Sequence, residues 1–227
     1  ADTPVLEALM RNPGVRLAAE TTDRLVREAA ESPSLAALLL KRPELRPAQA
    51  LALFWEVDHR LRNVILQRFA VERGIMREAA EDVFARASDA READAQLSRA
   101  LGFMDRRQRD RSALERSSFS DLEAAVEAAA RGRLDDTLSD EIAALAGVER
   151  SLFERMKEDF GGEGLAVMAK GTGLSRRHLV MLIEACGRAR AQTLRQAETT
   201  YASLSVDKAQ TVLRYWDWSW ARARDAG

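Results

Sequence analysis

The sequence predicts an all-α fold, and three features of its composition and patterning support this prediction. The 227 residues include 40 alanines, 28 leucines and 31 arginines but only 13 valines and 4 isoleucines. Alanine, leucine and arginine lose little side-chain freedom in a helix, whereas β-branched residues lose more. All five prolines lie within the first 47 residues, and no segment shows the sustained alternation of a half-buried strand. We therefore expect helices throughout.

Length and composition also exclude several classes of protein. With 46% hydrophobic residues the chain can bury a core, and a net charge of −1 gives no overall attraction to nucleic acid or membrane. One cysteine and two histidines exclude a disulfide framework and a multi-histidine metal site. The sequence shows no signal peptide and no 18-residue apolar run. We expect a cytoplasmic protein with no membrane span and no cofactor.

Residues 1–87 are expected to form an N-terminal array of helical hairpins. Asn12-Pro13-Gly14 ends a first helix, and Ser32-Pro33-Ser34 begins a third, with the proline near its first turn. Each expected helix is too short to bury its own apolar face, which favours stacked helical hairpins. The expected helices are 5–10, 15–30, 35–41, 48–55, 58–71 and 75–87.

Residues 88–227 are expected to form a C-terminal helical subdomain, although the two parts could also be one continuous domain. Residues 88–116 are rich in both charges and predict solvated helices. Ser120 and Glu123 form a capping-box pattern that predicts a helix from Ser120 to about residue 131. One long helix is expected from Ser175 past Gly187 toward residue 203, and Ser205 begins a last helix.

Two segments of the C-terminal part echo each other. Residues 141–156 and 165–182 both have the pattern of a helix, a glycine turn and a second helix, with Gly147 matching Gly173 and Arg150 matching Arg176. This arrangement is like the DNA-binding helix-turn-helix. It is also the ordinary geometry of two packed helices, and we favour packing for both units.

Several stretches together resemble a known family. They are Arg42-Pro43-Glu44-Leu45, residues 53–57 and 61–69, Gly162 to Lys170, and Gly173-Leu174-Ser175-Arg176. These stretches resemble an uncharacterised alphaproteobacterial family known only by a domain-of-unknown-function number (two-three-three-six), over about residues 4–220. The resemblance implies an all-helical cytoplasmic protein with HEAT-like repeats near its N-terminus. It implies no catalytic residues.

Nucleic-acid binding is the alternative function. The second unit carries Lys170, Arg176, Arg177 and His178, and residues 163–227 have a net charge of +4. Because phosphate contacts supply most nucleic-acid affinity, this modest excess is a weak indication. We interpret His178 as a surface imidazole, with phosphate contact as the other reading.

The C-terminal aromatic residues suggest a protein contact instead. Trp216 and Trp220 share one face of the expected helix and fit either the core or a partner, whereas Tyr215 and Trp218 form a second apolar face beside Arg214. Tryptophan and tyrosine are enriched at the centres of protein interfaces. We therefore predict that Tyr215, Trp218 and Arg214 contact a partner protein or a second copy of the chain.

No pattern in the sequence indicates catalysis. Asp58 and His59 have no serine or cysteine nucleophile nearby, and Cys186 lies among apolar helix residues, which predicts a buried thiol. The turns at Gly161–Gly164 and Gly171–Gly173 lack the lysine and strand of a phosphate-binding loop. We expect a non-enzymatic interaction or scaffold protein.

Overall fold

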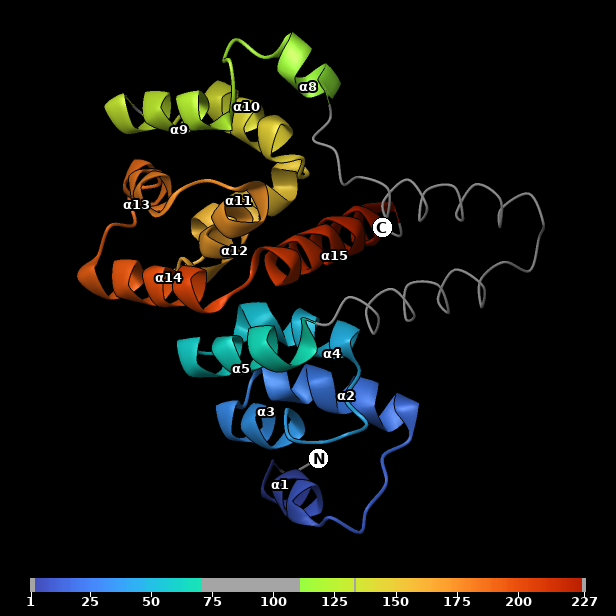
Figure 1. The fold of residues 1–227 in the computed structure, drawn as a ribbon. Helices are drawn as coiled ribbons and strands as arrows, with labels where there is room; N and C mark the ends of the chain where they lie inside the picture. Colours follow the sequence, from blue (N-terminus) through green and yellow to red (C-terminus); the bar gives the residue numbers. More distant parts are fainter. Residues whose placement is uncertain (1–2, 71–110, 133, 226–227) are drawn as a thin grey trace, which may run out of the picture. The chain divides into compact units, whose positions relative to one another are not determined.

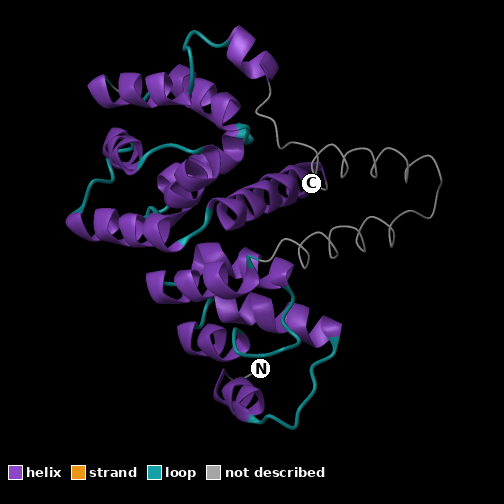
Figure 2. Ribbon diagram, in the orientation of Figure 1, coloured by secondary structure: helices purple, strands orange, loops and turns teal. Residues whose placement is uncertain are grey.

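The computed structural model describes residues 3–70, 111–132 and 134–225, and it contains helices and loops but no strand within these ranges (Figures 1 and 2). The prediction of an all-α fold is confirmed. The chain divides into two compact units, 1–75 and 76–227, and each is described by itself. The boundary expected at residues 87 and 88, the helix expected over 75–87 and the segment 88–110 lie outside the described residues. None of the described helices has the length and apolarity needed to cross a bilayer.

The described part of unit 1 consists of five short α-helices and one turn of 3₁₀ helix, which directly follows the fourth helix, and short loops join the other elements. The helices of unit 1 pack against one another in the order α1, α3, α2, α4 and α5, and each contacts the next in this order. Ser32 and Asp58 cap helices by accepting from the backbone N–H groups of Leu35 and Leu61. The elements are α1 (Thr3–Arg11), α2 (Ala19–Ala30), α3 (Pro33–Leu39), α4 (Pro47–Leu53), η1 (Phe54–Glu56) and α5 (His59–Phe69).

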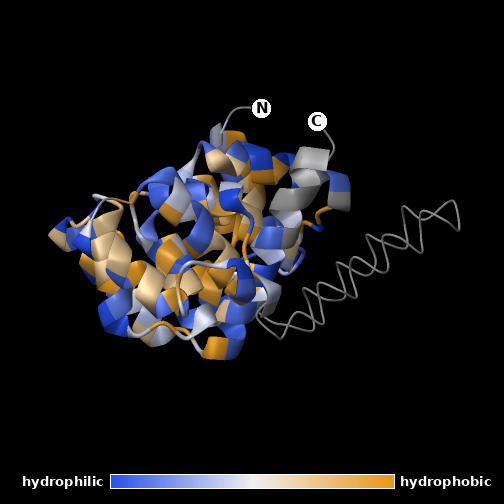
Figure 3. Cartoon of the chain, turned by 90° about the horizontal axis from the view of Figure 1, so that it is seen from above, coloured by the Kyte–Doolittle hydropathy of each residue, from blue (hydrophilic) through white to orange (hydrophobic). Residues whose placement is uncertain are grey.

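The core of unit 1 is made mainly of leucine. Helices of seven to twelve residues are marginal by themselves, so their stability comes from burying one apolar face against neighbours. Each fully buried leucine or isoleucine contributes about 1.5–3 kcal/mol. Hydrophobic and hydrophilic residues both occur along the helices coloured in Figure 3, as amphipathic helices require. The fully buried large side chains here are Leu35, Leu39, Leu40, Leu51, Leu53, Phe54, Ile65 and Leu66. Whether the array is HEAT-like stays a prediction.

Unit 2 contains eight described helices. The helix-turn-helix-like units correspond to α10 with α11 and to α12 with α13, with Gly147 and Gly173 in left-handed turns. The helices are α8 (Arg111–Arg116), α9 (Leu122–Arg131), α10 (Asp136–Ala146), α11 (Arg150–Glu158), α12 (Glu163–Thr172), α13 (Arg176–Ala185), α14 (Ala191–Ser203) and α15 (Val206–Asp225).

Helix α12 is the centre of unit 2. Every residue from Glu163 to Ala169 is buried, and the helix contacts α11, α13, α14 and α15. A helix that is buried on all sides must lie within a core. The side-chain amide of Gln210 on α15 donates to the carbonyl oxygen of Gly171 at 3.2 Å, which ties the end of α12 to α15.

Two expectations about helix ends were wrong. The long helix expected from Ser175 to residue 203 is two helices, because the backbone N–H of Arg188 bonds back to the carbonyl oxygen of Ile183 and closes α13 at this point. The cap of α9 is Asp121 and not Ser120, since the Asp121 carboxylate accepts from the Ala124 N–H at 2.8 Å. A carboxylate one residue later replaces the serine as acceptor.

We predict that Gly162→Ala destabilises unit 2 more than Gly147→Ala. Both glycines have positive φ, which costs alanine about 1–3 kcal/mol. At Gly162 an added Cβ would also lie 3.1 Å from Thr193 Cγ2, whereas at Gly147 it meets nothing within 4 Å. Urea denaturation followed by circular dichroism measures both losses of unfolding free energy. Equal losses would contradict the argument.

Candidate functional site

The candidate site lies in unit 1, where the loop between α3 and α4 meets the loop between α1 and α2. The first loop contains Arg42-Pro43-Glu44-Leu45. Leu45 is buried and Pro47 begins α4, so the loop is fixed at its end. The Arg42 side chain turns inward and is only 7% exposed.

The Arg42 guanidinium fastens the two loops together. Nη1 donates to the carbonyl oxygen of Asn12 at 3.1 Å, and Nη2 donates to the carbonyl oxygen of Val15. Nε and Nη2 also donate to the two carboxylate oxygens of Glu44 at 3.2 and 2.9 Å. Glu44 in turn accepts from the backbone N–H of Leu17. We call this set of bonds the Arg42 clamp.

The clamp explains why α2 begins four residues later than expected. Residues 15–18 were predicted to be helical, but Arg42 and Glu44 bind the Val15 carbonyl and the Leu17 N–H and hold them in the loop. The hydrogen bonds from Arg42 lower the pKa of Glu44, so its carboxylate stays charged. The pair therefore offers little net charge to a ligand.

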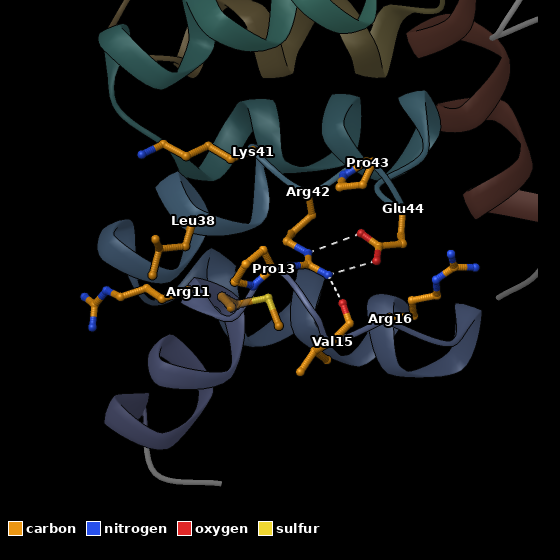
Figure 4. A pocket seen from close by; sticks show the side chains of 10 residues that line it. Arg11, Pro13, Val15, Arg16, Leu38, Lys41, Arg42, Pro43 and Glu44 are labelled. Carbon is orange, nitrogen blue, oxygen red and sulfur yellow. Dashed lines mark hydrogen bonds and ion pairs between the residues drawn. The ribbon is translucent and has the colours of Figure 1, made fainter.

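A cleft of about 760 Å³ opens beside the clamp, as Figure 4 shows. This volume falls in the range of ligand-binding pockets. Its lining combines apolar groups with cations and holds one acidic residue, Glu44. The lining residues are Met10, Arg11, Pro13, Val15, Arg16, Leu38, Lys41, Arg42, Pro43 and Glu44.

Three exposed cations lie around this lining. Arg11 pairs with Glu7 at 2.9 Å on its own helix. Arg16 and Lys41 have no carboxylate within ion-pair distance in the part of the chain that the structure describes. In Figure 4 Leu38 lies between Arg11 and Lys41, and Arg16 lies on the other side of the Arg42–Glu44 pair. The cleft can therefore offer apolar contact and positive charge at once.

The one carboxylate of the cleft lining, Glu44, is hydrogen-bonded to Arg42. The lining has neither serine nor cysteine nor histidine. Asp58 serves as the cap of α5, and both ring nitrogens of His59 lie near the Asn63 amide at 3.1 and 3.3 Å. Among the described residues no group of three or more His, Cys, Asp or Glu could hold a metal ion.

Of the residues predicted for nucleic-acid contact, two cations are engaged within unit 2. Lys170 Nζ lies 4.4 Å from the centre of the Tyr201 ring, and Arg176 pairs with Glu198 at 2.8 Å. Arg177 is exposed. In the helix-turn-helix-like pair α10 and α11, Arg150 pairs with Asp136 and Asp140 at 3.0 and 2.9 Å, and also with Glu154.

His178 is buried, so its interpretation as a surface imidazole was wrong. It lies on the face of α13 that packs against α9. Its Nδ1 is 2.9 Å from Ser175 Oγ and 3.6 Å from Glu123, and its Nε2 is 3.6 Å from Glu127. A phosphate at this ring would meet two carboxylates.

The residues predicted for partner contact lie on α15. Tyr215 is buried and Arg214 is half-buried, while the side chain of Trp218 lies outside what the structure describes. Trp216 is only 2% exposed and belongs to the core. That Tyr215, Trp218 and Arg214 contact a partner stays a prediction, but the burial of Tyr215 leaves it little free surface.

Sequence reasoning missed the cleft. Its residues come from two segments, 10–16 and 38–44, that are separated by α2 and most of α3. The available signal was the similar composition of these segments, since each carries one proline and two cations next to apolar residues. Only the fold shows that they meet.

These features define an all-helical protein of short packed helices with a basic-rimmed cleft. The chain belongs to the family described as "Uncharacterised protein conserved in bacteria (DUF2336)", whose model matches residues 1–214. The match confirms the resemblance seen in the sequence. Comparison with curated proteins and with solved structures gave no match.

We predict that Arg42→Met lowers the unfolding free energy of unit 1 by about 2 kcal/mol, because the carbonyl oxygens of Asn12 and Val15 and the carboxylate of Glu44 lose a part-buried donor. The matched control is Arg24→Met on the exposed surface of α2, which should change stability by less than about 0.5 kcal/mol. Urea denaturation measures both, and hydrogen exchange should rise at residues 12–18 in Arg42→Met alone. Equal losses of unfolding free energy and equal hydrogen exchange at residues 12–18 in the two variants would show that Arg42 does not hold the two loops together.

We predict that Cys186 alkylates slowly in the folded protein. Burial raises the pKa of its thiol to about 12, although nearby Lys157 opposes this, so about one thiol in ten thousand is ionised at pH 8. The folded thiol keeps its proton to higher pH than the unfolded thiol, whose pKa is near 9. The free energy of unfolding is therefore unaffected by this group below pH 9 and falls as pH rises from about 9 toward 12. Iodoacetamide labelling should be at least about 100-fold slower than in urea-unfolded protein. Equal rates would show that the thiol is accessible.

Proposed function

We propose that this protein is a non-enzymatic, cytoplasmic protein–protein interaction protein and that the cleft on unit 1 binds its partner. The observation that carries the proposal is the cleft itself. It combines an apolar lining with two exposed cations, Arg16 and Lys41, that form no ion pair within the described residues. Solvent-exposed apolar surface next to charge is typical of interaction sites.

The interior of the cleft is held before a partner arrives. The Arg42 clamp fixes the loop between α1 and α2 against the loop between α3 and α4. A site that is already ordered loses less conformational entropy on binding. This supports a binding role for the cleft over a role as an accidental gap between helices.

The nucleic-acid alternative has weaker support. Lys170 and Arg176 already contact Tyr201 and Glu198, and His178 faces Glu123 and Glu127. Of the four residues predicted for phosphate contact, only Arg177 is exposed and forms no ion pair within the described residues, and nucleic-acid affinity depends on such contacts. Its helix α12 is buried on all sides and supports the core.

Selection of a phage-displayed random peptide library against the full chain tests the proposal. We expect peptides that bind wild type and lose at least about tenfold in affinity against Leu38→Gln, since an apolar anchor is typically worth that much. The matched control is Val64→Gln, which removes an exposed apolar residue of α5 that does not line the cleft. Circular dichroism checks that both variants fold.

Lys41→Ala gives a second test at an exposed position, where folding is not at risk. Peptides that bind the two cleft variants and the control equally well would place binding elsewhere. A selection that yields no peptide dependent on Leu38 or Lys41 overturns the proposed function.

A further inference from the structure

We infer that the cleft recognises an acidic peptide segment that carries an apolar side chain beside its carboxylates. This inference rests on the proposed function and names the chemistry of the partner. It follows from which charges in the cleft are already paired, from where the remaining charges lie, and from the apolar residues beside them.

The charges that remain for a ligand are positive. Arg42 and Glu44 neutralise each other, with Arg42 Nη2 2.9 Å from Glu44 Oε1. Arg11 shares its charge with Glu7. Arg16 and Lys41 form no ion pair with a carboxylate in the described part of the chain, and both are exposed. A ligand in the cleft therefore meets cations and no free carboxylate, which favours an anionic partner and penalises a cationic one.

The cations lie on different sides of the clamp. In Figure 4 Lys41 and Arg16 lie on opposite sides of the Arg42–Glu44 pair, and Leu38 lies on the same side as Lys41. An extended segment that carries two carboxylates can contact both cations and place an apolar side chain against Leu38.

This arrangement favours a peptide over a nucleic acid or a free phosphate. Phosphate sites bring several donors together on one anion, commonly backbone N–H groups at a helix terminus. Here the N–H of Leu17 already donates to Glu44, and that of Gly14 donates to the Asn12 side chain at 2.9 Å. Two unpaired cations would also neutralise few phosphates of a nucleic acid, whereas the prolines and Leu38 suit an aliphatic side chain.

A charge-reversal experiment tests this inference. The probe is the phage-displayed random peptide library, selected in parallel on wild type and on the double variant Arg16→Glu and Lys41→Glu. We expect wild type to enrich Asp or Glu beside an apolar residue. The double variant should enrich Lys or Arg at those positions, because the charges at residues 16 and 41 are reversed from positive to negative.

The matched control is the double variant Arg27→Glu and Arg60→Glu, which reverses two exposed arginines of α2 and α5 that do not line the cleft. It has the same net charge as the cleft variant. A synthetic acidic peptide from the wild-type selection should bind the cleft variant at least about tenfold more weakly and the control within about twofold. Its affinity for wild type should also fall as salt rises.

The outcomes separate this inference from the proposed function. If the selected peptides depend on Leu38 but are neutral, or bind the charge-reversed variant equally well, the cleft binds peptides and the inference is wrong. If no selected peptide depends on the cleft, the proposed function fails as well. If a DNA oligonucleotide or inorganic phosphate displaces the acidic peptide at comparable concentration, the site is a general anion site and the inference is overturned.

Discussion

Short helices leave many backbone groups without partners inside their own helix, and the structure depends on side chains from other elements that bond these groups. The first N–H groups and last carbonyl groups of every helix have no partner within it. In unit 1 three arginines supply donors: Arg42 to the loop before α2, Arg62 to the Val57 carbonyl at 2.9 Å, and Arg68 to the Leu40 carbonyl. In unit 2 the Tyr201 hydroxyl and the Thr193 hydroxyl do the same at the carbonyls of Leu174 and Phe160. Burying a carbonyl without such a donor would cost about 1–3 kcal/mol, which is a large part of the stability of one small unit.

This use of arginine changes how the charge of the sequence should be interpreted. Many arginines fasten loops or pair with nearby carboxylates, so a local excess of basic residues does not measure the positive charge available to a ligand. Arg176 contacts Glu198, and Arg188 donates to the Lys157 carbonyl and lies over the Phe160 ring. The basic stretch over residues 170–195 is therefore partly structural. The cleft on unit 1 draws less attention in the sequence, yet Arg16 and Lys41 there keep their charge free within the described residues.

Local signals in the sequence predicted the fold well, and contacts between distant residues account for what they missed. The helix class and the glycine turns at Gly147 and Gly173 depend on neighbouring residues and were predicted correctly, and the Ser32-Pro33-Ser34 signal placed the start of α3 two residues late, at Leu35. The late start of α2 depends on Arg42, which is 27 residues from Val15, and no local pattern contains that information. The burial of His178 likewise depends on Glu123 and Glu127 of α9. The cleft could not be predicted because it exists only where two loops meet.

The Arg42 clamp and the cations around the cleft have different roles, although all are basic residues of the same short segments. Arg42 is buried and its charge is matched by Glu44, so it determines where the loops lie and adds little attraction for an anion. Lys41 is its neighbour in sequence but points to solvent, where its charge adds attraction and does not hold the loop. Loss of Arg42 should therefore act through stability and loop order, and loss of Lys41 through affinity. This division of roles, with an exposed cation beside an open apolar surface, is the strongest physical support for the binding role proposed for the cleft.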